Sequence, residues 1–146
     1  MIRKMKKDDL EETAKLLDAY RVFYKQESDY KKALQFLTER FEKQESIVFV
    51  AENNHQLVGF TQLYPIFTTV GLNRGYLLND LYVDINYRKQ GYGSALIQKT
   101  FDYGKNQQAS FILLETAIDN TTAQRVYKKN GMKLEDDVYY FYKSLK

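Results

Sequence analysis

LLNDLYVDINYRKQGYGSAL, residues 77–96, is the most informative segment of this chain. Its opening part, Leu77–Val83, is rich in apolar residues, which is typical of a buried strand. A short turn follows, and GYGSAL then predicts the beginning of a helix. The order strand, turn and helix puts Gly91 and Gly93 at the point where the helix begins.

The residues around this helix start suit an anion. The first amides of a helix lack intrahelical acceptors, and the helix dipole adds partial positive charge there. Gly91 and Gly93 leave the backbone open to close approach, while Arg88 and Lys89 bring full charges. Residues 88–94, called the anion cradle below, are therefore predicted to hold a phosphate or pyrophosphate, although paired glycines at a helix start also occur as plain turn chemistry. The spacing fits neither a Rossmann fingerprint nor a P-loop.

The rest of the chain alternates between strand and helix patterns. We expect strands at residues 1–6, 47–52, 56–67, 75–84, 110–117 and 138–145. We expect helices after Asp8 or Asp9, after Ser28 or Asp29, over residues 90–106, and from Asn120 to the pair Asn130–Gly131. Pro65 predicts a strand end, an edge or a bulge. The order predicts a single domain, residues 1–146, built as a mixed α/β sheet packed against helices.

Composition excludes several kinds of chemistry. The 146 residues contain no cysteine and a single histidine, His55, in a polar turn. Ser–His–Asp and Cys–His catalysis, acyl-cysteine intermediates and histidine-based zinc sites are therefore not expected, and neither is any other metal site. No apolar run is long enough for a membrane span, and the N-terminus does not resemble a signal peptide, so we expect a cytoplasmic protein. The net charge of +3 favours solubility or attraction of an anionic cofactor.

The anion cradle resembles the pyrophosphate-binding motif of the GNAT superfamily of acetyl-CoA-dependent acyltransferases, Arg/Gln-x-x-Gly-x-Gly/Ala. Arg88, Gly91 and Gly93 occupy its defining positions. A later segment, DNTTAQRVYKKNGMK, resembles a second GNAT motif through Asn120 and Tyr127. The resemblance covers the chain from Ile47 onward, and the segment around Asp80 is also similar to histone and polyamine acetyltransferases.

The resemblance implies a fold and a binding site for acetyl-CoA. It implies a twisted mixed sheet of about six or seven strands with about four helices, and a V-shaped cleft where the strands 77–83 and 110–116 part. Backbone groups of the first strand would pair with pantetheine, and a free N–H there would polarise the thioester carbonyl. The residues implied in coenzyme binding are Leu81, Tyr82, Val83, Arg88, Lys89, Gln90, Gly91, Tyr92, Gly93, Ser94, Asn120 and Tyr127.

Transfer to an amine makes two demands on the protein. A lysine-like amine has a pKa of about 10.4 and must lose a proton before it attacks. Asp80 is our candidate base, with Glu115 as runner-up and a water chain or a purely orienting role for Asp80 as alternatives. The departing thiolate gains from a proton donor, and Tyr127 matches the family position for that acid or for a hydrogen bond to sulfur; core packing is the alternative. Lys128 and Lys129 could meet the 3′-phosphate or simply face solvent.

The acceptor and the assembly are less defined. Tyr20, Tyr24 and Tyr30 lie where GNAT proteins often form the acceptor wall, and nearby acidic residues could attract a cation. We predict acetyl transfer to a primary amine of a small molecule or protein, with a non-catalytic acyl-CoA sensor as the alternative. The scattered lysines argue against nucleic-acid binding, no membrane partner is expected, and the tyrosine-rich last strand suggests a homodimer.

Overall fold

The computed structural model describes all residues from Met1 to Lys146 and groups them into two compact units. Unit 1 is Met1–Glu115 and unit 2 is Thr116–Lys146. Unit 1 contains a five-stranded sheet and three α-helices, whereas unit 2 contains the single helix α4 (Thr121–Lys129).

The sheet of unit 1 is mixed, as the sequence predicted. Its strands are β1 (Ile2–Lys4), β2 (Ile47–Asn53), β3 (Gln56–Thr68), β4 (Asn73–Val83) and β5 (Phe111–Leu113), and they lie in the order β1-β2-β3-β4-β5. The first four strands pair antiparallel, and β5 pairs parallel with β4. The parallel pair is possible because the crossover between β4 and β5 contains a helix that packs back on the sheet.

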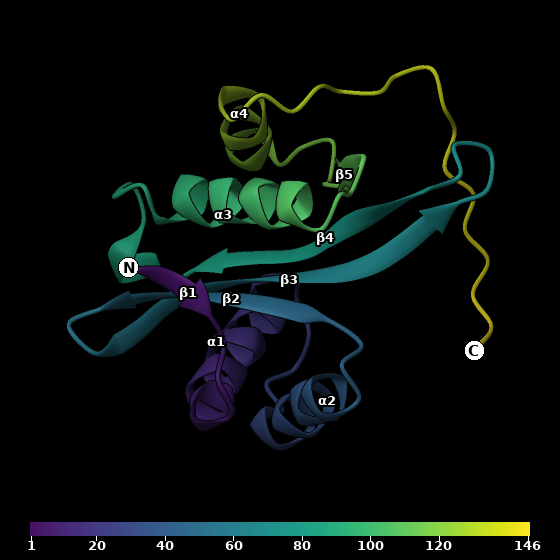
Figure 1. Cartoon of the computed structure of the whole chain (residues 1–146). Helices are drawn as coiled ribbons and strands as arrows, with labels where there is room; N and C mark the ends of the chain where they lie inside the picture. The colour runs from purple at the N-terminus through teal and green to yellow at the C-terminus, as the bar shows by residue number, and fades with distance from the viewer. The chain divides into compact units, whose positions relative to one another are not determined.

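Helices cover both faces of this sheet (Figure 1). Helix α3 (Tyr92–Asn106) lies on one face, while α1 (Leu10–Phe23) and α2 (Tyr30–Glu42) lie on the other. Short 3₁₀ turns at Lys7–Asp9 and Ile85–Tyr87 lead into α1 and toward α3. The buried faces of α1 and α2 form one apolar cluster with β2 and β3, which fixes both helices against the sheet.

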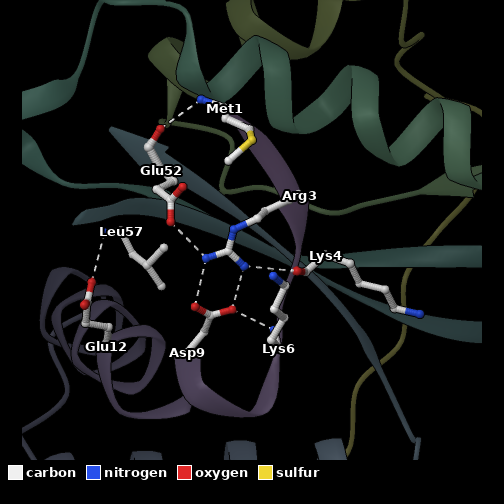
Figure 2. Close-up of polar contacts among 8 residues, drawn as sticks. All are labelled: Met1, Arg3, Lys4, Lys6, Asp9, Glu12, Glu52 and Leu57. Carbon is white, nitrogen blue, oxygen red and sulfur yellow. Dashed lines mark hydrogen bonds and ion pairs between the residues drawn. The ribbon is translucent and has the colours of Figure 1, made fainter. Parts of the chain in front are cut away.

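A cluster of charged groups holds the N-terminal corner together (Figure 2). The guanidinium of Arg3 donates to both carboxylate oxygens of Asp9, at 2.7 and 2.9 Å, and to Glu52 Oε1 at 3.0 Å. Glu12 accepts from the backbone N–H of Leu57 at 2.9 Å. These contacts join β1, α1 and the β2–β3 hairpin. Asp9 was predicted as a possible helix cap, but its carboxylate is engaged by Arg3 and by the amide of Lys6 instead of capping α1.

Two other helix ends match their predictions, and the start of α3 differs by two residues. Asp29 caps α2 by accepting from Lys32 N at 3.1 Å. Helix α3 begins at Tyr92 rather than Gln90, because the turn before it is not helical. The stop at Asn130–Gly131 is confirmed, since α4 ends at Lys129 and Gly131 has a φ of 90°, in the left-handed region that glycine tolerates.

Three strand predictions need correction. Residues 138–145, expected to form a last strand, form no strand, so the sheet has five strands instead of about six or seven. A strand needs a neighbouring ladder for its N–H and C=O groups, and β propensity alone does not supply one. The strand expected at 110–117 is only Phe111–Leu113. The prediction for Pro65 is confirmed, because Pro65 lies in the part of β3 beyond Leu63 that pairs with β4 alone and is therefore at an edge.

The longest helix of the structure is α3, with 15 residues, and no helix combines the length and the apolar character that crossing a membrane requires.

Candidate active site

The anion cradle begins helix α3. Gly91 is the N-cap residue, with φ 89° and ψ 0°, and its carbonyl accepts the first helical hydrogen bond, from Ala95 N at 3.0 Å. Lys89 also has a positive φ, 63°. Left-handed residues alternating with right-handed ones curve the backbone so that successive amides turn toward the same side, which is the geometry of an anion site. The dipole of a 15-residue helix adds positive potential at this end.

Space for a ligand is present at both glycines. A Cβ atom added at Gly91 or Gly93 would meet no protein atom within 4 Å. Neither position therefore needs glycine to avoid a clash within the protein. Gly91 needs it for the left-handed backbone, whereas the φ of Gly93 imposes no such requirement. The open space fits the close approach of a diphosphate to the helix backbone.

Arg88 fixes the loop that leads into the cradle. Its Nε donates to the carbonyl oxygen of Val83 at 2.9 Å, and its guanidinium lies 5.5 Å from the ring centre of Tyr82 and 5.7 Å from that of Phe23. One nitrogen thus ties the loop to the end of β4. The residue stays exposed, and its charge adds to the positive potential near the start of α3.

Strand β4 has an open edge beside the cradle. It pairs with β5 only over Gly75–Leu77, so the residues from Leu78 to Val83 have no partner on that side. On the other side, Leu81, Tyr82 and Val83 remain paired with β3. The parting of β4 and β5 predicted from the sequence is therefore present in unit 1. An extended ligand segment could add to this edge as a strand does.

A β-bulge marks the point where β4 changes its environment. Gln62 of β3 pairs with Asp80, and Leu63 pairs with Leu78, so Asn79 is the extra residue. The hydroxyl of Thr61 donates to the carbonyl oxygen of Asp80 at 2.8 Å. A bulge re-aims the side chains around it, and this one lies between the paired and the open part of β4.

Asp80 is a buried carboxylate with neutral partners. Its side chain accepts from Gln62 Nε2 at 2.8 Å and from Asn79 Nδ2 at 3.2 Å, and Tyr20 adds a hydrogen bond. Only 7% of the residue is exposed, and no cation forms an ion pair with it. Burial raises the pKa of Asp80, and the three hydrogen bonds only partly oppose this. A carboxyl with a raised pKa is a better proton acceptor than an ordinary aspartate.

Gln62 holds Asp80 in place, and the sequence analysis missed it. Gln62 is fully buried, and its carbonyl oxygen accepts from Ser46 Oγ at 2.8 Å while its amide donates to Asp80. The amide orientation is thereby fixed. A glutamine inside the apolar run LVGFTQLY was a signal, because a buried amide requires partners.

A cavity of 350 Å³ opens at Asp80, on the face of the sheet that carries α1 and α2. It is lined by Leu17, Tyr20, Arg21, Lys32, Ala33, Phe36, Gln62, Tyr64, Asn79 and Asp80. Its volume falls in the lower part of the range for small-molecule sites. Burial, together with the charge of Asp80, raises the pKa of Tyr64 to about 12, so its phenol stays protonated and can donate. Of the three tyrosines predicted for an acceptor wall, only Tyr20 lines this cavity.

Unit 2 contains the two remaining motif residues. Asn120 is the N-cap of α4, where its Oδ1 accepts from Ala123 N at 3.2 Å. Tyr127 lies four residues after Ala123, on the same face of the helix, and is half-buried. The second motif is therefore one short capped helix. Lys128 and Lys129 are exposed in its last turn.

The other sequence candidates lie elsewhere. Glu115, the alternative base, is exposed at the end of unit 1, two residues beyond β5. Asp84 accepts from Asn86 N at 2.9 Å, which is the turn role predicted for it. His55 lies exposed in the β2–β3 turn. No three His, Cys, Asp or Glu side chains gather in an arrangement that could hold a metal.

The acetyltransferase (GNAT) family model matches residues 10–132. The chain belongs to the GNAT acetyltransferase family. The uncharacterized N-acetyltransferase YhfO of Bacillus subtilis is 40% identical over 141 residues, which cover 97% of this GNAT chain and 94% of that protein. A crystal structure of a probable acetyltransferase, 29% identical, superimposes with a TM-score of 0.94 and covers 100% of this chain and 98% of its own.

The GNAT assignment confirms the predicted class of reaction. The protein is an acetyltransferase that moves an acetyl group from acetyl-CoA to an amine, and a purely non-catalytic module is not favoured. AAC(6′)-Iy, solved with the bisubstrate analogue CoA-S-monomethyl-acetylneamine, has the same fold, with a TM-score of 0.82 and 20% identity over 99% of this chain and 97% of that one.

Proposed function

We propose that this GNAT protein is a single catalytic domain, residues 1–146, that acetylates a small primary amine by direct transfer from acetyl-CoA. The observation that carries this proposal is the conjunction within unit 1 of an anion cradle, an open β4 edge and a cavity ending at a buried carboxylate. One strand and the loop after it contribute to all three. The coenzyme-binding half and the acceptor-binding half of the site can therefore meet along β4.

The cradle residues would hold the coenzyme diphosphate. Backbone amides near Gly91 and Gly93 and the charge of Arg88 supply the donors, with Lys89, Gln90, Tyr92 and Ser94 around them. Leu81, Tyr82 and Val83 would pair with the pantetheine arm through backbone groups. Asn120 would contact the same arm, a role suggested by its motif position.

Asp80 would accept the proton that the acceptor ammonium must lose. Its raised pKa and its position at the end of the cavity support this role, with a relayed transfer through water as the alternative. The neutral nitrogen then bonds to the thioester carbonyl carbon, and the carbon–sulfur bond breaks. Tyr127 would return a proton to the leaving thiolate, a role suggested by its position in the second motif. No acyl-enzyme is needed, consistent with a chain that has no cysteine.

Thiol release tests the proposal. Acetyl-CoA is incubated with the protein and a panel of primary amines, and free CoA is followed with a thiol reagent. We expect amine-dependent release that Asp80→Asn reduces. Tight CoA binding without release on any amine would refute catalysis and favour a sensor. Glu115→Gln is the matched control, because the alternative base should affect the rate only if Asp80 does not.

Location and assembly remain predictions from the sequence. We propose a cytoplasmic homodimer that binds neither nucleic acid nor membrane. The segment Val138–Leu145 supports the dimer, because its aromatic side chains are exposed and its backbone forms no strand. Sedimentation of the full chain tests the dimer, and a protein that sediments as a monomer at micromolar concentration would refute it. The similarity to histone and polyamine acetyltransferases stays a prediction about the acceptor.

A further inference from the structure

Charged side chains of both signs line the cavity beside Asp80. Asp80 contributes a buried carboxylate to the lining from β4, whereas Arg21 and Lys32 contribute two cations from α1 and α2. The side chain of Lys32 is 82% exposed and that of Arg21 is 35% exposed, so both cations lie toward solvent while Asp80 is buried. The lining therefore combines one buried carboxylate with two cations that lie closer to solvent.

The two cations are weakly paired within the protein. Arg21 Nη1 lies 3.9 Å from Asp18 Oδ1, and Lys32 Nζ lies 3.8 Å from Asp29 Oδ2, both long for a hydrogen-bonded ion pair. Arg21 also donates to the carbonyl oxygen of Glu27 at 3.3 Å.

The neighbouring carboxylates have closer partners. Asp18 accepts from Ser28 Oγ at 2.6 Å and from Asp29 N at 2.7 Å, and Asp29 in turn caps α2. These contacts organise the α1–α2 connection. Because the ion pairs to Asp18 and Asp29 are long, the two cations can also contact an anionic group on a ligand.

The rest of the lining is mostly apolar or aromatic. Leu17 and Ala33 are buried, and Tyr20, Phe36 and Tyr64 add ring surface. A ligand seated here would contact carbon along its middle and charged groups only at its ends. A polycation such as an aminoglycoside would instead place positive charge against Arg21 and Lys32, which like-charge repulsion disfavours.

We propose that the acceptor is a small amine that also carries a carboxylate, such as an amino acid, with its ammonium directed to Asp80 and its carboxylate bound by Arg21 and Lys32. This inference rests on the proposed function for the identity of the reacting end. Arg21 presents a planar guanidinium that can bind a carboxylate through two donors, and Lys32 adds a mobile point charge. The two residues are specificity determinants and take no part in the chemistry.

Matched amines that differ only in the carboxylate test the proposal. L-lysine is compared with cadaverine and 6-aminohexanoate with pentylamine, because both acids carry an amine and a carboxylate at opposite ends of a carbon chain, and sisomicin serves as the polycationic probe. We expect kcat/KM to favour each amino acid over its decarboxylated partner by about tenfold or more, since a charge-assisted contact at a partly exposed site has that effect. A preference for cadaverine, pentylamine or sisomicin would overturn the proposal.

Substitution of the cations provides the second arm. In Arg21→Gln combined with Lys32→Gln, KM for the amino acid should rise until the preference disappears, while kcat and the rate with cadaverine change little, because the contact lies away from the reacting atoms. Lys31→Gln is the matched control, since Lys31 is an exposed neighbour on α2 outside the cavity lining. An undiminished preference in the double variant would refute the role of these residues.

A binding measurement separates this inference from the proposed function. Equilibrium dialysis of L-lysine and cadaverine against the intact protein needs no turnover. If no amine releases thiol but L-lysine binds in preference to cadaverine and loses this preference in the double variant, the transferase role fails and the selective cavity stands. If amines turn over without any selectivity for a carboxylate, the inference fails and the transferase role stands. Absence of both turnover and selective binding overturns both.

Discussion

The Gly93→Val substitution tests the anion cradle without disturbing the rest of the fold. Gly93 is the second residue of α3, its φ lies outside the left-handed region, and a Cβ there meets no protein atom within 4 Å. Valine is a better helix residue than glycine by about 0.3 kcal/mol, so the free energy of unfolding should stay equal or rise slightly. The added methyl groups occupy space that remains open in the protein and that a diphosphate would need.

The expected loss of affinity follows from the donors that would be blocked. If two backbone amides no longer reach the diphosphate, each lost hydrogen bond to a charged group costs about 1.5–3 kcal/mol. Together these losses weaken CoA binding by about 10²–10⁴-fold, using about 1.4 kcal/mol for each factor of ten. Titration calorimetry with CoA gives the affinity, and thermal unfolding of the same samples reports whether the fold is intact.

Two further variants make the result specific. Gly93→Ala keeps the residue that the family motif also accepts here, and it should bind CoA with little loss while raising helix stability by up to about 1 kcal/mol. Gly91→Ala differs because the φ of 89° opposes any side chain, at a cost of about 1–2 kcal/mol, so it should lower stability as well as affinity. A folded Gly93→Val protein that binds CoA like the wild type would refute the cradle assignment.

Three other predictions concern protons. Because burial raises the pKa of Asp80, the stability that its neutral form provides is complete below the unfolded pKa and is lost as the pH rises through the folded pKa. Asp80→Asn should therefore raise the melting temperature at neutral but not at low pH, and should lower kcat by about 10²–10⁴-fold. The hydrogen bond from Ser28 lowers the pKa of Asp18. The stability that this hydrogen bond provides is therefore present above the unfolded pKa near 3.8 and is lost as the pH falls through the folded pKa. Ser28→Ala should reduce the free energy of unfolding only at pH values above that range. Tyr127→Phe should reduce kcat by about tenfold or more with little change in CoA affinity.

Each of these predictions has a distinct contrary result. If Asp80→Asn turned over at the wild-type rate, the Asp80 carboxylate would not lie on the proton path, and a water chain or Glu115 would be favoured as the base. Equal destabilisation of Ser28→Ala at pH 3 and pH 7 would show that the hydroxyl acts independently of the charge on Asp18. An unchanged kcat in Tyr127→Phe would show that Tyr127 is not the proton donor and only packs on α4.

Local patterns were predictable wherever neighbouring residues alone set the conformation. The Gly91–Gly93 turn, the cap at Asp29, the β2–β3 hairpin and the stop at Asn130–Gly131 all depend on backbone preferences of a few adjacent residues. The family motif at residues 88–93 likewise predicted the reaction class, because its arginine and glycines lie within six residues of one another in the chain.

Pairing between distant segments could not be predicted from local sequence patterns. The extent of β5 and the absence of a strand at residues 138–145 depend on which backbone edges find a partner, and no local propensity encodes that. Asp9 shows the same limit, since its carboxylate could cap a helix but a nearby Arg3 offers two charged donors.

The sequence by itself predicted an anion site at the start of a helix and the transfer of an acetyl group, and the family assignment confirms the transfer. Only the tertiary structure decided what surrounds Asp80. Gln62 of β3 and the cations of α1 and α2 come from segments far from Asp80 in the chain, and the packing of the helices on the sheet brings them to one cavity. Burial, which raises the pKa of Asp80, exists only once the helices pack on the sheet, because an unfolded chain leaves every carboxylate in water.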